Sequence, residues 1–444
     1  MVSIKLPEIE TRTLRNGLRV LAVKACTLPL VRVVLMVKRG TEWDEDGKAG
    51  QADLTCEMVT LGTQSRSSQQ IALDIDSLGA RFSFYSGWDA SFFEVEGLAE
   101  DLQSLLEIVS DFVLRPTFPK REFDQLRGRR IARLIQDQDE SEVVADEQFL
   151  QLVFGGTPYG HPRRGTIGSV KALSVEDLQT FHERHFLADH CTLIIVGDID
   201  FEDTFQIAEE FLGAMKKGLD GPDLHAFSIP KRRNRQVRII HRPDLTQSQI
   251  RMGHAAIRRT SPDYDVFQVA NYILGGGGFS SRLMEKVRSQ LGYTYGISSR
   301  FRGRKNPGPF VISTFTPNEN TVAVVDEVLS VVEMFIHEGV TSQELEEAQN
   351  FYLGSYAFRF ETPRKIAREI LEVELYGLGL QSLTDYPRRI SKVTEAGILK
   401  VTGRHIFPKS FVVVIVGNCE VFRKAVEKLG PVQITDFQAL MGES

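Results

Sequence analysis

Arg288 and Tyr295 are two residues of this 444-residue chain whose side chains could stabilise a developing negative charge. A guanidinium and a phenol are both fixed hydrogen-bond donors, and such donors contribute about 3–4 kcal/mol to a transition state that carries an oxyanion. The pattern predicts Arg288 late on a helix and Tyr295 on the strand that follows a Leu291-Gly292 helix stop. Tyr293 would project from the same face of that strand and is the alternative donor. The same residue types are equally typical of a surface arginine and a half-buried sheet tyrosine.

A glycine run precedes this pair and could lie against a peptide backbone. It consists of Gly275, Gly276, Gly277 and Gly278, followed by Phe279, Ser280 and Arg282. The run lacks the Gly-Lys-Ser/Thr of a phosphate loop, and it follows an apolar helical segment where a dinucleotide fingerprint would follow a strand. Because glycine has no side chain and tolerates positive φ, the segment suits close approach of a substrate backbone. A tight turn without a ligand is the alternative interpretation.

Asp53, Cys56 and Glu57 lie in the segment GQADLTCEMVTLGT, residues 50–63, which is expected to be helical. Asp53 and Glu57 are four residues apart and would share one face of the helix. Two carboxylates can bind a hard cation weakly, whereas zinc peptidase sites favour imidazole ligands. We therefore expect no metal at these positions.

A second group with metal-like spacing is HERHFLADHC, which contains His182, His185, His190 and Cys191. An internal duplication argues against a metal site there, because His405 takes the position of His185 in the second copy and has no chelating neighbours. A structural role at a helix end is the favoured interpretation. A self-sufficient metal-dependent hydrolase built on these histidines is the alternative.

The duplication relates residues 174–200 to residues 392–420. In each copy an Arg-His pair precedes an apolar strand that ends in Val-Gly, and one constant offset superposes both features. Helix and strand patterns are interleaved in both halves, which predicts two homologous α+β domains, each a mainly antiparallel sheet covered by helices. We expect domains at residues 1–214 and 235–444, joined by a Gly-, Pro- and charge-rich linker at residues 215–234.

The composition excludes several classes of protein. A formal charge of −6 gives no nucleic-acid or anionic-membrane signature, and no stretch approaches a membrane span. The four cysteines form no CxxC pair, and the basic clusters at residues 120–133, 231–238 and 300–305 are interpreted as solvated surface. The N-terminus lacks the apolar run of a signal peptide, so the chain as written is expected to be cytoplasmic, or periplasmic if a leader has been removed.

These segments together resemble the pitrilysin family, the inverzincin zinc peptidases. The resemblance is carried by TRTLRNGLRVL, Gly62-Thr63, ADEQFLQLVFGGTPYGHP, the Val-Gly-Asp at residues 196–198 and the glycine segment, and it covers nearly the full length. The short two-domain members include mitochondrial processing peptidase and bacterial two-subunit peptidases. The resemblance implies one half-shell of a clam-like chamber.

The family pattern has His-x-x-Glu-His where this chain has Asp53, Cys56 and Glu57. Its third zinc ligand, a glutamate, would fall near Ala132 or Arg133, neither of which can serve. The resemblance therefore implies a subunit that lacks zinc and any other cofactor and does not cleave peptides alone. Zinc is expected on a homologous partner chain.

In this family an arginine and a tyrosine at the spacing of Arg288 and Tyr295 donate to the substrate carbonyl, and the glycine segment borders the chamber. The implied function is that of the non-zinc-binding subunit of a heterodimeric zinc metalloendopeptidase. Its partners would be the zinc-bearing subunit and a peptide substrate, with no nucleic acid and no membrane. A catalytically inactive scaffold of the same fold, like the core-type subunits of a respiratory complex, is the alternative.

Overall fold

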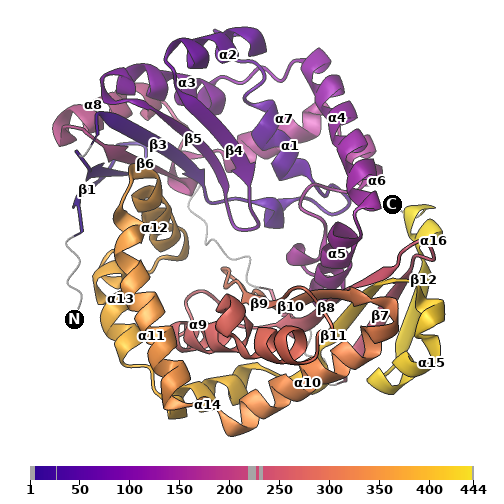
Figure 1. Cartoon of the computed structure of the whole chain (residues 1–444). Helices are drawn as coiled ribbons and strands as arrows, with labels where there is room; N and C mark the ends of the chain where they lie inside the picture. The colour runs from indigo at the N-terminus through magenta and orange to yellow at the C-terminus, as the bar shows by residue number, and fades with distance from the viewer. Residues whose placement is uncertain (1–5, 27, 219–226, 230–233, 443–444) are drawn as a thin grey trace.

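The computed structural model describes residues 6–26, 28–218, 227–229 and 234–442. Strands within the described residues form two six-stranded sheets on opposite sides of the molecule (Figure 1). The first comprises β1 (Glu8–Thr13), β2 (Arg19–Lys24), β3 (Leu30–Val37), β4 (Arg81–Ser86), β5 (Ser91–Leu98) and β6 (Cys191–Gly197). The second comprises β7 (Gln236–His241), β8 (Gln247–Ala255), β9 (Ile297–Phe301), β10 (Pro309–Pro317), β11 (Val412–Gly417) and β12 (Val432–Asp436).

The strand order confirms the duplication. The first sheet is ordered β1-β2-β6-β3-β5-β4 and the second β12-β7-β11-β8-β10-β9, so five strands correspond one to one. The pairs β2–β6 and β7–β11 are parallel, and the three pairs that follow in each sheet are antiparallel. The sixth strand differs, since β1 is antiparallel to β2 whereas β12 is parallel to β7. The predicted α+β class with mainly antiparallel sheets is correct.

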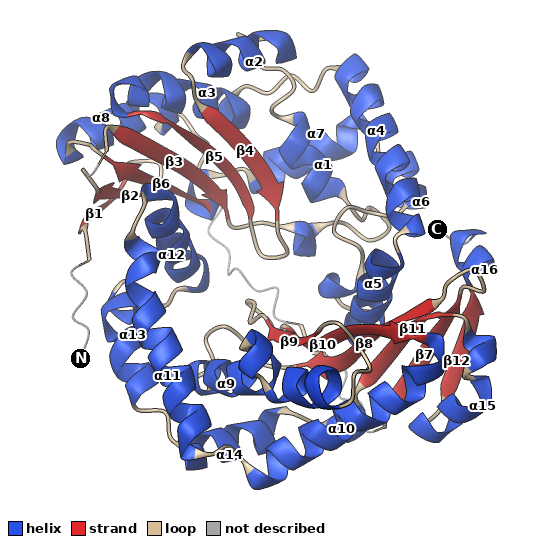
Figure 2. Ribbon diagram, in the orientation of Figure 1, coloured by secondary structure: helices blue, strands red, loops and turns tan. Residues whose placement is uncertain are grey.

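Helices cover the sheets in both halves (Figure 2). The first half contains α1 (Gln51–Met58), α2 (Ser68–Ser77), α3 (Leu102–Leu114), α4 (Lys120–Asp139), α5 (Ser141–Phe154), α6 (Ile167–Ala172), α7 (Val175–His185) and α8 (Phe201–Leu212). The second contains α9 (Tyr264–Asn271), α10 (Thr321–Glu338), α11 (Ser342–Tyr356), α12 (Pro363–Tyr376), α13 (Gln381–Ser391), α14 (Glu395–His405), α15 (Arg423–Val426) and α16 (Phe437–Gly442). π-Helical turns span Tyr272–Gly276 and Met284–Gln290.

The central strands of both sheets are buried on both faces, which is why they read as nearly continuous apolar runs. In β3, Val33 and Leu35 belong to the core formed with the half's own helices, whereas Val34 and Met36 pack on the opposite face. That opposite face is covered by α12, whose Ile366 and neighbours come from the other half of the chain.

The two halves exchange one helix each. Helix α5 packs on β8 and β11 of the second sheet, and α12 packs on β3 and β6 of the first (Figure 1). The helices that cover each sheet, as expected, therefore include one from the other half of the chain. The exchange holds the halves together independently of the linker. Most of the linker expected at residues 215–234 lies outside the described residues, and so does the domain boundary expected there.

A hairpin loop at residues 302–308 adds a polar connection between the halves. Asp89 of the first half accepts hydrogen bonds from the Lys305 backbone at 3.2 Å and from Tyr376 at 3.0 Å, and it also accepts one from Tyr159. Arg304 is buried with its guanidinium 4.7 Å from the rings of both Trp88 and Tyr159. The prediction that residues 300–305 form a solvated loop is wrong for Arg304.

Two smaller expectations concern membranes and cysteines. No helix of the described residues is long and apolar enough to cross a membrane. Cys191 and Cys419 are buried free thiols, as predicted, and Cys56 is buried as well. Cys26 is exposed.

Candidate functional site

Helix α1 carries the residues at the metal-motif positions, and Asp44 fixes its start. The Asp44 carboxylate accepts hydrogen bonds from the backbone of Gly50 and of Ala52, each 2.7 Å long. The helix then places Asp53 and Glu57 one turn apart on the same face.

The guanidinium of Arg130, on α4, lies between these two carboxylates. It pairs with Asp53 and, at 3.1 Å, with Glu57. The side chains of Arg130, Asp53 and Glu57 are only 11%, 18% and 22% exposed, so the group is largely withdrawn from water. Arg129 adds a longer contact to Glu57 at 3.6 Å. The guanidinium of Arg130 thus lies between the two side chains that stand at the metal-ligand positions of the family pattern.

Cys56 stands where the family has its general base. Its sulfur lies 4.0 Å from the carbonyl oxygen of Phe92, and the side chain is fully buried. Burial raises the pKa of this thiol well above its ordinary value. The group therefore stays protonated at neutral pH and cannot take a proton from water.

The residues present do not fit zinc. Arg133, near which the third ligand is expected, pairs with Asp137 at 2.8 Å, and the residues of α4 that reach α1 are Arg129 and Arg130, about one turn earlier. Within the described part of the chain, no group of three or more His, Cys, Asp or Glu side chains could hold a metal ion. A catalytic zinc site with three anionic or imidazole ligands and an open position is not formed here.

The histidine group at residues 182–191 does not converge either. His182 donates from Nε2 to the carbonyl of Val113 at 2.9 Å, and burial lowers its pKa to about 4. His190 bonds to the backbone of His185 at 3.3 Å, and Cys191 lies inside β6. These contacts are structural, as the duplication suggests.

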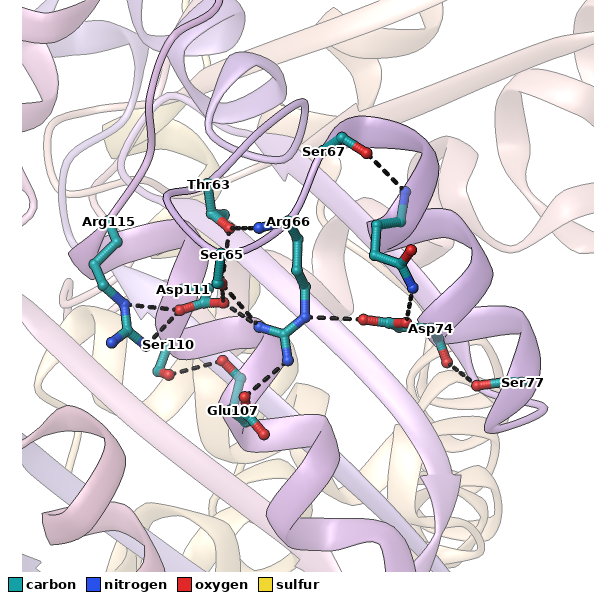
Figure 3. A network of polar contacts seen from close by, with 11 residues as sticks. Thr63, Ser65, Arg66, Ser67, Asp74, Ser77, Glu107, Ser110, Asp111 and Arg115 are labelled. Carbon is teal, nitrogen blue, oxygen red and sulfur yellow. Dashed lines mark hydrogen bonds and ion pairs between the residues drawn. The ribbon is translucent and has the colours of Figure 1, made fainter.

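The segment that follows α1 is held by a polar network centred on Arg66 (Figure 3). Arg66 donates to Asp74 at 2.9 Å and to Glu107 at 2.8 Å, and it also pairs with Asp111. Asp111 is buried and accepts a second guanidinium, that of Arg115, at 2.8 Å. The network fixes α2 against α3 in the region next to α1.

The glycine segment begins inside the first π-helical turn and continues towards the second, and its residues differ in accessibility. Gly275 is buried, and a Cβ atom there would lie 2.6 Å from the backbone nitrogen of Ser299. Gly278 has φ +63° with open space around it, a conformation that favours glycine. Gly276, Phe279 and Ser280 are exposed and Gly277 is half-buried. Substrate contact is therefore compatible with the second part of the run, whereas Gly275 serves packing.

Arg282 has a packing role in the free chain, and its predicted contact with substrate stays a prediction. Its guanidinium forms a two-pronged ion pair with Glu344, at 2.6 and 2.8 Å, and lies over the Phe335 ring. Glu344 in turn caps the start of α11. This arrangement fixes the π-helical segment to α11.

Arg288 is positioned by the glycine segment. Its guanidinium carbon lies 4.5 Å from the ring centre of Phe279, a cation–π contact. Among the described residues no carboxylate lies within 4.0 Å of Arg288, in contrast to Arg282. The guanidinium is therefore aimed by an aromatic ring and keeps its hydrogen-bonding capacity.

Tyr295 lies in a loop rather than on a strand, because β9 begins only at Ile297. The side chain of Thr294 closes this loop by bonding to the backbone of Gly296 at 3.0 and 3.1 Å. Tyr295 is 81% exposed, whereas Tyr293 packs against the core of the second half. The prediction that Tyr293 and Tyr295 project from the same face of one strand is wrong. Tyr295 is the one of the two whose phenol is accessible.

A cavity of ≈ 890 Å³ lies between the halves. Its wall is formed by α5, residues 160–164, β8, β10 and the start of β9. Met284 of the second π-helical turn and Gly296, the neighbour of Tyr295, also line it. Arg288 and Tyr295 themselves are not part of the described wall, and Tyr295 is exposed next to Gly296, which is.

Two family models match this chain, one to each half. The model described as "Insulinase (Peptidase family M16)" matches residues 19–167, and the model described as "Peptidase M16 inactive domain" matches residues 172–352. The chain belongs to peptidase family M16, the pitrilysin family. Residues 19–167 include α1, so it is the half matched by the peptidase model that lacks the zinc ligands in this M16 protein.

Relatives carry both peptidase and non-peptidase names. An "Uncharacterized zinc protease" of Rickettsia bellii is 26% identical over 338 residues, which cover 76% of this chain and 80% of the relative. The "Non-peptidase homolog YmxG" of Helicobacter pylori is 23% identical over 339 residues, which cover 76% of this chain and 77% of the relative. A solved structure titled as the peptidase M16 inactive domain from Pseudomonas fluorescens has a TM-score of 0.86 at 26% identity and covers 92% of this chain and 98% of its own. With its degenerate zinc motif, the chain is a catalytically inactive type of M16 protein.

The residue that sequence reasoning missed is Arg130. It lies within the basic cluster at residues 120–133, which was expected to be a solvated helix face. The signal available was its place on the helix expected to carry the third ligand, opposite two carboxylates that need a counter-charge.

Proposed function

We propose that this chain is the non-zinc-binding subunit of a heterodimeric zinc metalloendopeptidase, and that Arg288 and Tyr295 bind substrate and stabilise the oxyanion at a zinc centre on a homologous partner chain. The observation that carries the proposal is the contrast between two sites. The metal-motif position is closed by Arg130, whereas Arg288 has no carboxylate partner among the described residues and Tyr295 is 81% exposed.

The donor pair suits this role chemically. When bound to the partner, zinc would supply the activated water and polarise the scissile carbonyl. Arg288 is held in place by Phe279 before substrate arrives, so little ordering is required when the oxyanion forms. Tyr295 offers a neutral donor to the same oxygen, and the exposed part of the glycine segment lies open to the peptide backbone.

A second half-shell is also supported by the size of a related structure. The chain aligns over its full length with the periplasmic protease PqqL from Escherichia coli, of which it covers 50%, with a TM-score of 0.78 at 18% identity. That fold therefore contains this half-shell within a chain about twice as long. A separate zinc-bearing M16 chain would supply the missing half for this protein.

The test is turnover of the purified chain mixed with a zinc-motif-bearing M16 chain from the same source. We expect Arg288→Ala and Tyr295→Phe to lower kcat of the mixture by about 100-fold or more, because each removes one donor to the transition state. Zinc content should not change, since neither residue approaches a metal ligand. Tyr293→Phe is the matched control for the phenol, and Arg388→Ala, an exposed arginine on α13, is the control for the guanidinium.

Unchanged kcat in both Arg288→Ala and Tyr295→Phe, in a mixture that cleaves peptide, would contradict the assigned role. A mixture that forms a stable complex but never cleaves peptide would favour the inactive scaffold of the same fold. Cleavage and zinc binding by this chain alone would contradict the subunit proposal altogether.

A further inference from the structure

The cavity between the halves is rich in arginine. Six arginines and four acidic residues line it, although the chain as a whole has a formal charge of −6. The arginines are Arg133, Arg163, Arg164, Arg251, Arg300 and Arg304, and the acids are Asp137, Glu142, Asp146 and Glu147. The cavity thus has the opposite charge to the chain.

The acidic residues are already engaged with some of these arginines. Asp137 pairs with Arg133 at 2.8 Å and with Arg164 at 3.2 Å. Asp146 and Glu142 pair with the buried Arg251, at 2.5 and 3.3 Å respectively.

Glu147, the fourth acidic residue, does little to neutralise the arginines that have no carboxylate partner. Burial raises the pKa of Glu147 to about 7, with the neighbouring Asp137 adding to the effect. Its carboxyl group is therefore only partly ionised at neutral pH.

Arg163, Arg300 and Arg304 have no carboxylate within 4.0 Å among the described residues, but Arg304 is buried against the rings of Trp88 and Tyr159. Arg163 and Arg300 are therefore the two that remain for a ligand. Arg163 donates to the carbonyl of Ser86 at 3.2 Å, which is the last residue of the edge strand β4. Arg300 is exposed on β9, the edge strand of the other sheet. One guanidinium without a carboxylate partner therefore lies beside a sheet edge in each half.

Like charges are concentrated around Arg163. Burial lowers its pKa, the nearby Asp53 opposes this, and repulsion from Arg164 and Arg302 lowers it further. Since Asp53 is already paired with Arg130, it cannot neutralise Arg163 as well. Guanidinium groups held close together without a sufficient counter-charge are typical of sites that receive anions.

We propose that the cavity binds extended peptide segments rich in Asp and Glu, whose carboxylates pair with Arg163 and Arg300. The volume of ≈ 890 Å³ lies near the upper end of the range of about 300–1,000 Å³ for ligand pockets, which suits a peptide of a few residues rather than a folded domain. Arg163 and Arg300 would each bind a carboxylate through two parallel hydrogen bonds. This inference rests on the proposed peptide-binding function and names the substrate class.

The experiment measures binding to the purified chain alone, by fluorescence anisotropy, with three labelled Gly-Ser octapeptides that carry Glu, Gln or Lys at the same three positions. We expect the Glu peptide to bind about tenfold more tightly than the Gln peptide at low salt, and the Lys peptide to bind most weakly. Arg163→Gln and Arg300→Gln should each weaken binding of the Glu peptide about five- to tenfold and leave the Gln peptide unaffected. Arg388→Gln, which does not line the cavity, is the matched control.

Equal binding of the three peptides, or loss of Gln-peptide binding to the same extent as Glu-peptide binding in the variants, would overturn the inference. A short oligonucleotide that bound as tightly as the Glu peptide would also overturn it, in favour of a general anion surface. Because no partner chain is present, failure here is separate from failure of the turnover test above. Melting temperatures of the variants check that each is folded, and Arg163→Lys should retain part of the preference for the Glu peptide.

Discussion

Arg130 shows how a metal site can be lost without loss of the local fold. In the family pattern a dication would hold α1 and α4 together, and here the guanidinium of Arg130 bridges Asp53 and Glu57 between the same helices. Replacement of both imidazoles by carboxylates alone would leave two like charges one turn apart on α1. Arg130 offsets the repulsion between Asp53 and Glu57, and its guanidinium also disfavours a metal cation between them.

Substitution of Arg130 should therefore destabilise the protein. We expect Arg130→Met to lower the free energy of unfolding by about 2–3 kcal/mol, less than for a fully buried pair because the carboxylates remain about one-fifth exposed. Arg129→Met, on a residue 55% exposed, should cost less than about 0.5 kcal/mol. Urea denaturation checks both values.

Adding Asp53→Asn and Glu57→Gln to Arg130→Met should recover part of the loss, because no uncompensated charge remains. A triple variant less stable than Arg130→Met would contradict this electrostatic explanation.

His254 should make the protein sensitive to mild acid. Its Nδ1 donates to the carbonyl of Ala255 at 2.8 Å, its Nε2 accepts from the backbone of Phe407 at 3.1 Å, and burial lowers its pKa to about 4. Above pH 6.5 the imidazole is neutral in both states. As the pH falls from 6.5 towards 4 the unfolded chain takes up a proton that the folded chain does not, so stability decreases, by about 2 kcal/mol at pH 5.

The urea midpoint of the wild type should accordingly fall between pH 7.5 and pH 5, and that of His254→Gln should fall by less. His182, whose pKa is also lowered to about 4, contributes in the same direction in both proteins. Equal falls in wild type and variant would show that His254 is not responsible.

At the scale of elements, the glycine segment depends on close approach of backbones. The turn at Tyr272–Gly276 places Gly275 directly against β9, whereas Gly354 lies within α11 with open space around its Cα. Both glycines lie in helical turns, but a methyl group would fit at Gly354 and would clash at Gly275.

We expect Gly275→Ala to lower the melting temperature by several degrees, because the new Cβ would lie 2.6 Å from the backbone of Ser299. Gly354→Ala should raise stability by about 0.5–1 kcal/mol, the ordinary difference between the two residues inside a helix. Melting temperatures of both variants, measured by differential scanning fluorimetry, check these two expectations. A neutral Gly275→Ala would mean that the turn is not packed as described.

The sequence predicts some of these elements and not others. The repeated Arg-His and Val-Gly features of residues 174–200 and 392–420 predicted the correspondence of β6 and β11, because both follow from local apolar patterns. The exchange of α5 and α12 could not be predicted, because the apolar face of a helix does not indicate which of the two sheets the helix packs on. The loop that carries Tyr295 was interpreted as strand because YTYGISS alternates, and the turn made by Thr294 overrides that alternation.

At the scale of the whole molecule, the two halves behave as one half-shell. The exchanged helices bury apolar faces of both sheets, and Asp89 joins three segments through Tyr159, Tyr376 and the Lys305 backbone. These contacts connect the two walls of the arginine-lined cavity. Arg288, which has no carboxylate partner among the described residues, and the exposed Tyr295 are then available to a second chain.

The most direct measurement is a titration of this chain into a fixed amount of a zinc-motif-bearing M16 chain from the same source, with peptide cleavage and bound zinc followed together. The account predicts no zinc and no cleavage for this chain alone. Cleavage by the mixture should rise to a plateau at one equivalent, with one zinc per pair. Two zinc ions per pair, or cleavage that does not depend on the added chain, would contradict it.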